Sequence, residues 1–199
     1  MESAASGRSN AVQWVIALGS WTVFALVAIG LLIPAVISLT ITRVGAPLSL
    51  IAAAAAAVGG SPSIDVALLV APAIVAVTSI FTAEFGRWMV QASAYGDEDR
   101  LPLRSPVPAG AAAVVSWILW APALLGGPLA LGTANWIAGI PLTFLAVAAT
   151  AFIGPRWHTM SRRWLVLVPA GLVVHDPVVL ADTLMVKTDQ ILSLGLARS

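Results

Sequence analysis

Few side chains in this sequence have the chemistry of a catalytic or metal site. The 199 residues include no cysteine and only two histidines, His158 and His175. A zinc site needs three or four converging ligands, and the acidic residue nearest to either histidine is Asp176. Asp176 precedes a proline, a position that favours aspartate because its side chain hydrogen-bonds to the backbone of a turn. We therefore expect no catalytic residue and no metal ligand.

Motifs of hydrolases and nucleotide-binding proteins are absent as well. The sequence contains no Gly-x-Ser-x-Gly, no His-Glu-x-x-His and no Gly-x-x-x-x-Gly-Lys-Ser/Thr, the patterns that would place a nucleophile, a zinc site or a phosphate-binding loop. A formal net charge of +1 without a basic patch gives no support for a nucleic-acid partner. These observations predict a protein that is not an enzyme, uses no cofactor and binds no nucleic acid.

Apolar residues dominate the rest of the sequence, including the predicted helices and strands that position the few polar side chains. Hydrophobic residues make up 59% of the sequence and charged residues 10%, whereas an ordinary soluble domain has about 25% charged residues. Residues 105–155 contain no Asp, Glu, Lys or Arg. A helix needs roughly 20 apolar residues to cross a bilayer, so this stretch has room for two helices and a turn. The sequence indicates an integral membrane protein.

We predict a membrane all-α fold class with four transmembrane helices, in a domain at residues 11–155. The expected spans are residues 12–39, 66–83, 111–125 and 136–152. Gly126-Gly127-Pro128 and Gly132 are predicted to form the turn between the last two spans. Residues 44–63 include six consecutive alanines. Because alanine is only weakly hydrophobic, we expect an interfacial or re-entrant helix there.

Each predicted span contains a proline, which predicts helix kinks at Pro34, Pro72, Pro122 and Pro141. Bent or broken helices are typical of transporters, whose unwound backbone can line a binding site. Proline is also commoner in membrane helices than in soluble ones, so the prolines alone do not decide the function.

Basic residues predict the orientation of the four spans. With a cytoplasmic N-terminus, seven arginines flank the spans on the inside and Arg43 alone flanks them on the outside. The inside residues are Arg8, Arg87, Arg100, Arg104, Arg156, Arg162 and Arg163. Because positive residues are enriched on the cytoplasmic side, we expect both termini in the cytoplasm, with residues 1–10 as a tail. The membrane is expected to be the inner (plasma) membrane of the cell.

A basic and aromatic cluster follows the last predicted span. Arg156, Arg162 and Arg163 can hold anionic lipid headgroups. Trp157 and Trp164 have amphipathic rings that favour the same level of the bilayer. We expect these five residues to contact lipid headgroups or a partner protein.

Short strands are predicted in a β-rich cytoplasmic module at residues 156–199. Short apolar runs bounded by turn residues are typical of strands and are too short to span a bilayer. The runs are residues 164–169, 172–175 and 183–187, and residues 191–194 fit either a fourth strand or the start of a short helix. They predict a small antiparallel sheet.

Residues Arg163–His175 and Thr183–Ile191 resemble the opening strands of bacterial pleckstrin-homology-like (PH-like) domains, which often follow transmembrane helices. The shared pattern is a strand, a turn with glycine, a second strand, and a third strand leading to a corner, here Asp189-Gln190-Ile191. The composition is also similar to that of multi-span membrane proteins of high-GC actinobacteria. The resemblance implies more strands than the residues after Pro155 can supply. We therefore expect a partial domain, either left open or completed by a partner.

Together these observations favour a non-catalytic accessory or scaffolding protein of the membrane, with a PH-like segment that docks a partner or a membrane surface. The alternative is a small-solute or lipid transporter that uses the proline-containing helices. The expected partners are membrane lipids, together with either other membrane proteins or further copies of this chain in a homo-oligomer.

Overall fold

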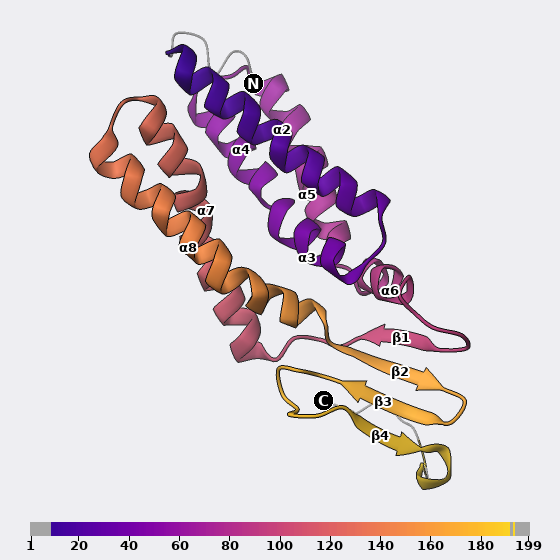
Figure 1. Ribbon diagram of the computed structural model, residues 1–199. Coiled ribbons are helices and arrows are strands. Elements are labelled where there is room, and N and C mark those ends of the chain that lie inside the picture. The colour runs from indigo at the N-terminus through magenta and orange to yellow at the C-terminus, as the bar shows by residue number, and fades with distance from the viewer. Residues whose placement is uncertain (1–8, 192, 194–199) are drawn as a thin grey trace.

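The computed structural model describes residues 9–191 and residue 193 (Figure 1). Long helices lie side by side, and a small sheet lies at one end of them. The helices are α2 (Asn10–Leu32), α3 (Val36–Gly45), α4 (Leu48–Val58), α5 (Ser63–Ile80), α6 (Ala83–Gln91), α7 (Val107–Gly132) and α8 (Trp136–Ser161). The strands are β1 (Asp99–Pro102), β2 (Trp164–Val168), β3 (Gly171–His175) and β4 (Leu184–Lys187), followed by a short 3₁₀ helix, η1 (Thr188–Gln190).

Five segments in the described part of the chain are long and apolar enough to cross a membrane. They are α2, α3 together with α4 (Val36–Val58), α5, α7 and α8. The predicted helical membrane domain is confirmed at this level, and the structure has five candidate spans where the sequence predicted four. The combined α3–α4 segment has 23 residues, about 35 Å at 1.5 Å per residue. That length is sufficient for the hydrocarbon core of a bilayer.

The additional candidate span arises because the first predicted span, residues 12–39, covers α2 and the beginning of α3, which run in opposite directions. Pro34 lies in the break between α2 and α3 rather than inside a bent helix, since proline has no N–H to donate within a helix. α3 therefore packs back against α2. Gly45 permits their close approach, because a Cβ at this position would lie 2.9 Å from Val27 Cγ2.

The alanine run belongs to this second candidate span, where the sequence predicted an interfacial or re-entrant helix. Residues 52–57 lie within α4, because alanine is the strongest helix former even though it adds little hydrophobicity. Ala53 and Ala56 are buried, and their small side chains allow neighbouring membrane helices to approach closely. The predicted start of the interfacial or re-entrant helix, residue 44, lies inside the α3–α4 segment.

α7 and α8 form an antiparallel hairpin whose turn lies later in the chain than predicted. Gly126-Gly127-Pro128 is inside α7, and residues 133–135 form the turn, with Ala134 at a φ of 59°. Gly127 is required at the helix crossing, because a Cβ there would lie 2.6 Å from the backbone nitrogen of Thr143. The other three prolines that were expected to kink spans all lie inside helices: Pro72, Pro122 and Pro141.

The sheet is an antiparallel meander with the strand order β1-β2-β3-β4. β2, β3 and β4 match the three strands predicted after residue 155, and η1 precedes residues 191–194, of which 192 and 194 lie outside the described residues. β1 comes from the segment between α6 and α7. It pairs with β2 in a register that runs from Asp99↔Leu167 to Pro102↔Trp164. The sheet is therefore built from two distant parts of the chain rather than from residues 156–199 alone.

Charged side chains gather at the end of the spans that carries the sheet, called here the sheet end. Ser9 Oγ donates a hydrogen bond to the Gly132 carbonyl at 3.3 Å, which places the start of α2 beside the α7–α8 turn. Figure 1 shows these segments at the opposite end from α6 and the sheet. Among the described residues, Asp65 in the first turn of α5 is the charged residue at the opposite end.

Candidate functional site

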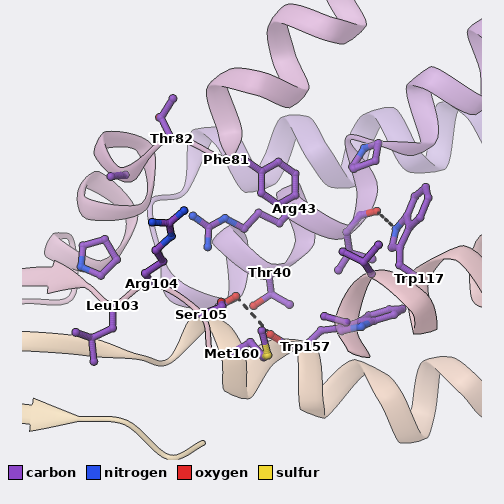
Figure 2. A pocket seen from close by; sticks show the side chains of 17 residues that line it. Thr40, Arg43, Phe81, Thr82, Leu103, Arg104, Ser105, Trp117, Trp157 and Met160 are labelled. Carbon is purple, nitrogen blue, oxygen red and sulfur yellow. Dashed lines mark hydrogen bonds between the residues drawn. The ribbon is translucent and has the colours of Figure 1, made fainter. Parts of the chain in front are cut away.

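A cavity of about 680 Å³ lies at the sheet end, between the helices and the first residues after β1. Its wall is formed by α3, the α5–α6 junction, residues 102–105, the early turns of α7 and the last turns of α8. Figure 2 shows Arg43 and Arg104 pointing toward one another on one side of the cavity, with Trp117 and Trp157 on the other. We call this cavity the arginine pocket.

Arg43 reaches the pocket from α3. Its Nε donates to the Ile80 carbonyl at 3.5 Å, and its Cζ lies 5.7 Å from the centre of the Phe81 ring, a favourable cation–π distance. Gly86 leaves room for the guanidinium, because a Cβ at that position would lie 3.1 Å from Arg43 Nη2. The charged group is thus held at the level where α5 ends, although α3 itself belongs to a candidate span.

Arg104 enters the pocket from the linker between β1 and α7, and its side chain is exposed. Within the described part of the chain, neither Arg104 nor Arg43 has a carboxylate within 4.0 Å. Three other arginines of the sheet end do have such partners. The pairs are Arg87–Asp99 at 2.8 Å, Arg100–Glu98 at 2.6 Å and Arg163–Asp176 at 2.6 Å. The pocket therefore carries two positive charges that no described acidic residue neutralises.

The opposite wall of the pocket is apolar and aromatic. Trp117 Nε1 donates to the Val44 carbonyl at 2.9 Å, and Trp157 Nε1 donates to Ser116 Oγ at 3.0 Å. Trp157 also packs edge-on against Trp120, with ring centres 5.2 Å apart. Because the indole N–H groups have internal partners, the tryptophans offer the pocket mainly their apolar ring surface.

The Arg163–Asp176 pair fixes the sheet to the pocket. Arg163 Nε and Nη2 donate to the two carboxylate oxygens of Asp176 at 2.7 and 2.6 Å, and Nη1 donates to the Arg104 carbonyl at 3.0 Å. These hydrogen bonds from Arg163 lower the pKa of the Asp176 carboxyl, and a bond from the Val178 N–H lowers it further. The predicted turn role of Asp176 is confirmed by the Val178 bond, at 3.2 Å. The buried ion pair is an additional role.

His175, the last residue of β3, stacks on Trp164 of the neighbouring strand β2. The centres of the His175 and Trp164 rings are 4.9 Å apart. Arg100 Cζ lies 5.6 Å from the centre of the Trp164 ring. Burial is the main cause that lowers the pKa of His175, with the positive charges of Arg162 and Arg100 adding to it. Over residues 9–191 and 193, no group of three or more His, Asp or Glu side chains could hold a metal ion.

The predicted headgroup residues fall into different environments. Arg156 and Arg162 are exposed at the sheet end, whereas Arg163 is buried and bound to Asp176. Trp157 is buried and lines the arginine pocket. Trp164 is partly buried against a cluster formed by Leu39, Met89 and Val90.

Sequence reasoning missed the two arginines of the pocket. A signal existed for Arg43, which is the sole charged residue between Arg8 and Asp65. An ionisable residue inside a membrane segment is a functional candidate by default. The predicted first span ended at residue 39, so Arg43 fell outside it. For Arg104 no local signal exists, because its position beside Arg43 depends on how the linker crosses the helix ends.

Comparison with protein-family models, with curated proteins and with solved structures finds no match to this chain. The resemblance of the C-terminal strands to PH-like domains therefore stays a prediction.

Proposed function

We propose that this chain is a non-catalytic accessory protein of the membrane, and that its sheet is a docking platform for a partner protein. The observation that carries the proposal is a sheet fixed to the spans at one side and open at the other. β1 lies nearest α6, and β4 forms the far edge of the meander.

Side-chain bonds and packing hold the inner side of the sheet. The amide of Gln91 donates to the Glu98 carbonyl and accepts from the Arg100 N–H, both at 2.7 Å. The buried Arg163 joins the sheet to the start of α7 through the Arg104 carbonyl. A platform held in this way can transmit the position of a docked partner to the membrane helices.

The outer edge has the properties of a docking surface. In the described residues β4 pairs only with β3, and its apolar side chains Leu184 and Met185 are 52% and 48% exposed. Proteins usually cover or protect an open strand edge, and an edge can accept an additional strand from a partner. The PH-like resemblance supports the same role, because a partial domain completed by a partner is one of the two arrangements that it implies.

Charge distribution supports a cytoplasmic sheet end. With five spans, seven arginines lie toward the sheet end, and Arg8 is the one arginine that precedes the first span in the sequence. The seven are Arg43, Arg87, Arg100, Arg104, Arg156, Arg162 and Arg163. Five spans with an external N-terminus place these seven arginines in the cytoplasm. This topology therefore satisfies the positive-inside rule, as the predicted four-span topology with two cytoplasmic termini did. We propose this orientation in the inner (plasma) membrane.

Affinity capture from native membranes in mild detergent tests the docking role. We expect a near-stoichiometric partner with the tagged chain, and its loss in Met185→Lys. Val179→Lys is the matched control, because Val179 is an exposed apolar residue outside β4. Recovery of the tagged chain alone as a homogeneous species, or equal loss of the partner in both variants, would contradict the proposal.

A second candidate function is transport of a small solute or lipid, and the arginine pocket favours it. The pocket lies between α3, α5, α7 and α8 at the sheet end. Its volume is large enough to hold part of a small amphiphilic molecule. Reconstitution separates the two functions: a transporter moves its substrate in liposomes that contain this chain alone, whereas an accessory protein does not.

A further inference from the structure

We infer that the arginine pocket binds the phosphate group of an anionic phospholipid, with Arg43 and Arg104 holding the phosphate from two sides. This inference does not depend on the docking role of the sheet. It rests on the charge of the pocket, on the character of its opposite wall and on its level in the molecule.

The charge argument comes from the contrast between arginines at the sheet end. Arg87, Arg100 and Arg163 each have a carboxylate partner, while Arg43 and Arg104 share one pocket with no described carboxylate in reach. Two guanidinium groups that point toward one another repel (Figure 2), and the repulsion is stronger beside a low-dielectric membrane. An anion between them would remove it. Arginine is well suited to a phosphate because its N–H groups match the phosphate oxygens in pairs.

The opposite wall argues for a lipid rather than a soluble anion. Val44, Pro47, Val114 and Trp117 line the part of the pocket that lies farther from the sheet along α3–α4 and α7. These residues are apolar or have their polar atom internally bonded, as Trp117 does. A soluble phosphate gains nothing from such a surface. A phospholipid places the first carbons of its glycerol and acyl chains against it.

The level of the pocket fits a headgroup. The pocket is bordered by the end of α5, the early part of α7 and the last turn of α8, where candidate spans leave the membrane. Ser105 lies on the same side as the two arginines, and its hydroxyl can donate a hydrogen bond to a phosphate oxygen. The pocket has its charged groups at the mouth and its apolar surface farther in. A phospholipid has the same order, with a charged phosphate followed by apolar chains.

Native mass spectrometry of the purified full chain tests the inference, with phosphatidylglycerol and phosphatidylcholine as the probes. We expect one tightly bound phosphatidylglycerol and weaker binding of phosphatidylcholine. Arg43→Gln and Arg104→Gln should each weaken phosphatidylglycerol binding about tenfold, the effect of losing a hydrogen bond to a charged group. Arg87→Gln is the matched control, because Arg87 is exposed at the same end, pairs with Asp99 and does not line the pocket. It should leave binding unchanged.

A charge reversal separates loss of binding from loss of folding. Arg104→Glu places a carboxylate near Arg43, so binding should be lost while the thermal midpoint stays the same or rises. Inorganic phosphate added in competition should not displace the lipid. The inference is overturned if both lipids bind equally, if Arg87→Gln weakens binding as much as the pocket variants, or if inorganic phosphate displaces the lipid.

Discussion

Arg163 and Asp176 form a bidentate ion pair across a hairpin, with donor–acceptor distances of 2.7 and 2.6 Å and side chains only 4% and 8% exposed. The pair joins the first residues after α8 to the end of β3, and through the Arg104 carbonyl it reaches the segment before α7. Three chain segments therefore depend on one guanidinium.

Asp176→Asn should destabilise the protein by about 3 kcal/mol, because removing one charge leaves the other buried without its counterion. The measurement is the thermal or denaturant unfolding of the purified protein in detergent, followed by circular dichroism. Asp182→Asn is the control, since Asp182 is exposed and has no ion pair among the described residues. Equal stability of the two variants would show that the pair contributes little.

The pH dependence of stability should reflect His175. Burial and nearby arginines lower the pKa of His175 in the folded state, so below the ordinary value of about 6.5 the unfolded chain binds more protons than the folded chain. Stability is therefore highest above this value and falls as the pH falls from about 7 toward the lowered pKa. His175→Gln should flatten this part of the stability profile. A wild-type stability that rises on acidification over this range would refute the assignment.

Gly127→Ala should weaken the α7–α8 hairpin by about 1–3 kcal/mol, the usual effect of overpacking. The added methyl group would lie 2.6 Å from the Thr143 backbone nitrogen and from its Oγ1. Gly154→Ala is the matched control in α8, because a Cβ added at Gly154 would meet nothing within 4 Å. The control should be neutral or stabilising, as alanine is the better helix former. Unfolding curves of both variants give the comparison.

Single cysteines can test the five-span topology, since the sequence contains no cysteine of its own. Ser9→Cys and Thr133→Cys should both react with a membrane-impermeant maleimide on intact cells, because both positions lie at the end opposite the sheet. Asp182→Cys should react only after the membrane is opened. The four-span topology makes a different prediction, with Ser9 protected in intact cells, so labelling of Ser9→Cys decides between them.

Local patterns in the sequence predicted the parts of the fold that depend on neighbouring residues. The charge-free stretch at residues 105–155 predicted the α7–α8 hairpin, and short β-branched runs predicted β2, β3 and β4. The alanine run was harder to interpret, because alanine has a high helix propensity and a low hydrophobicity: it was predicted to be interfacial or re-entrant and lies within a candidate span.

Local sequence patterns could not predict features that depend on contacts between distant segments of the chain. The sequence did not predict β1, because this strand pairs with β2 through residues as far apart as Asp99 and Leu167, which no local pattern connects. Arg87 likewise pairs with Asp99, twelve positions later, and not with Glu84 one helical turn away. The arginine pocket depends on the same non-local placement, since Arg43 and Arg104 meet only when the linker after β1 crosses the ends of the helices.

The origin of β1 also sets an order of events during synthesis. β1 is translated before α7 and α8, and its partner Leu167 follows Asp99 by 68 positions (167 − 99). At typical elongation rates the strand waits roughly 3–14 seconds for β2. During that time the last hairpin must enter the bilayer while an unpaired strand stays at its base. The sheet can therefore close only after both final helices have been synthesised, so its completion marks the end of the helical part of the chain.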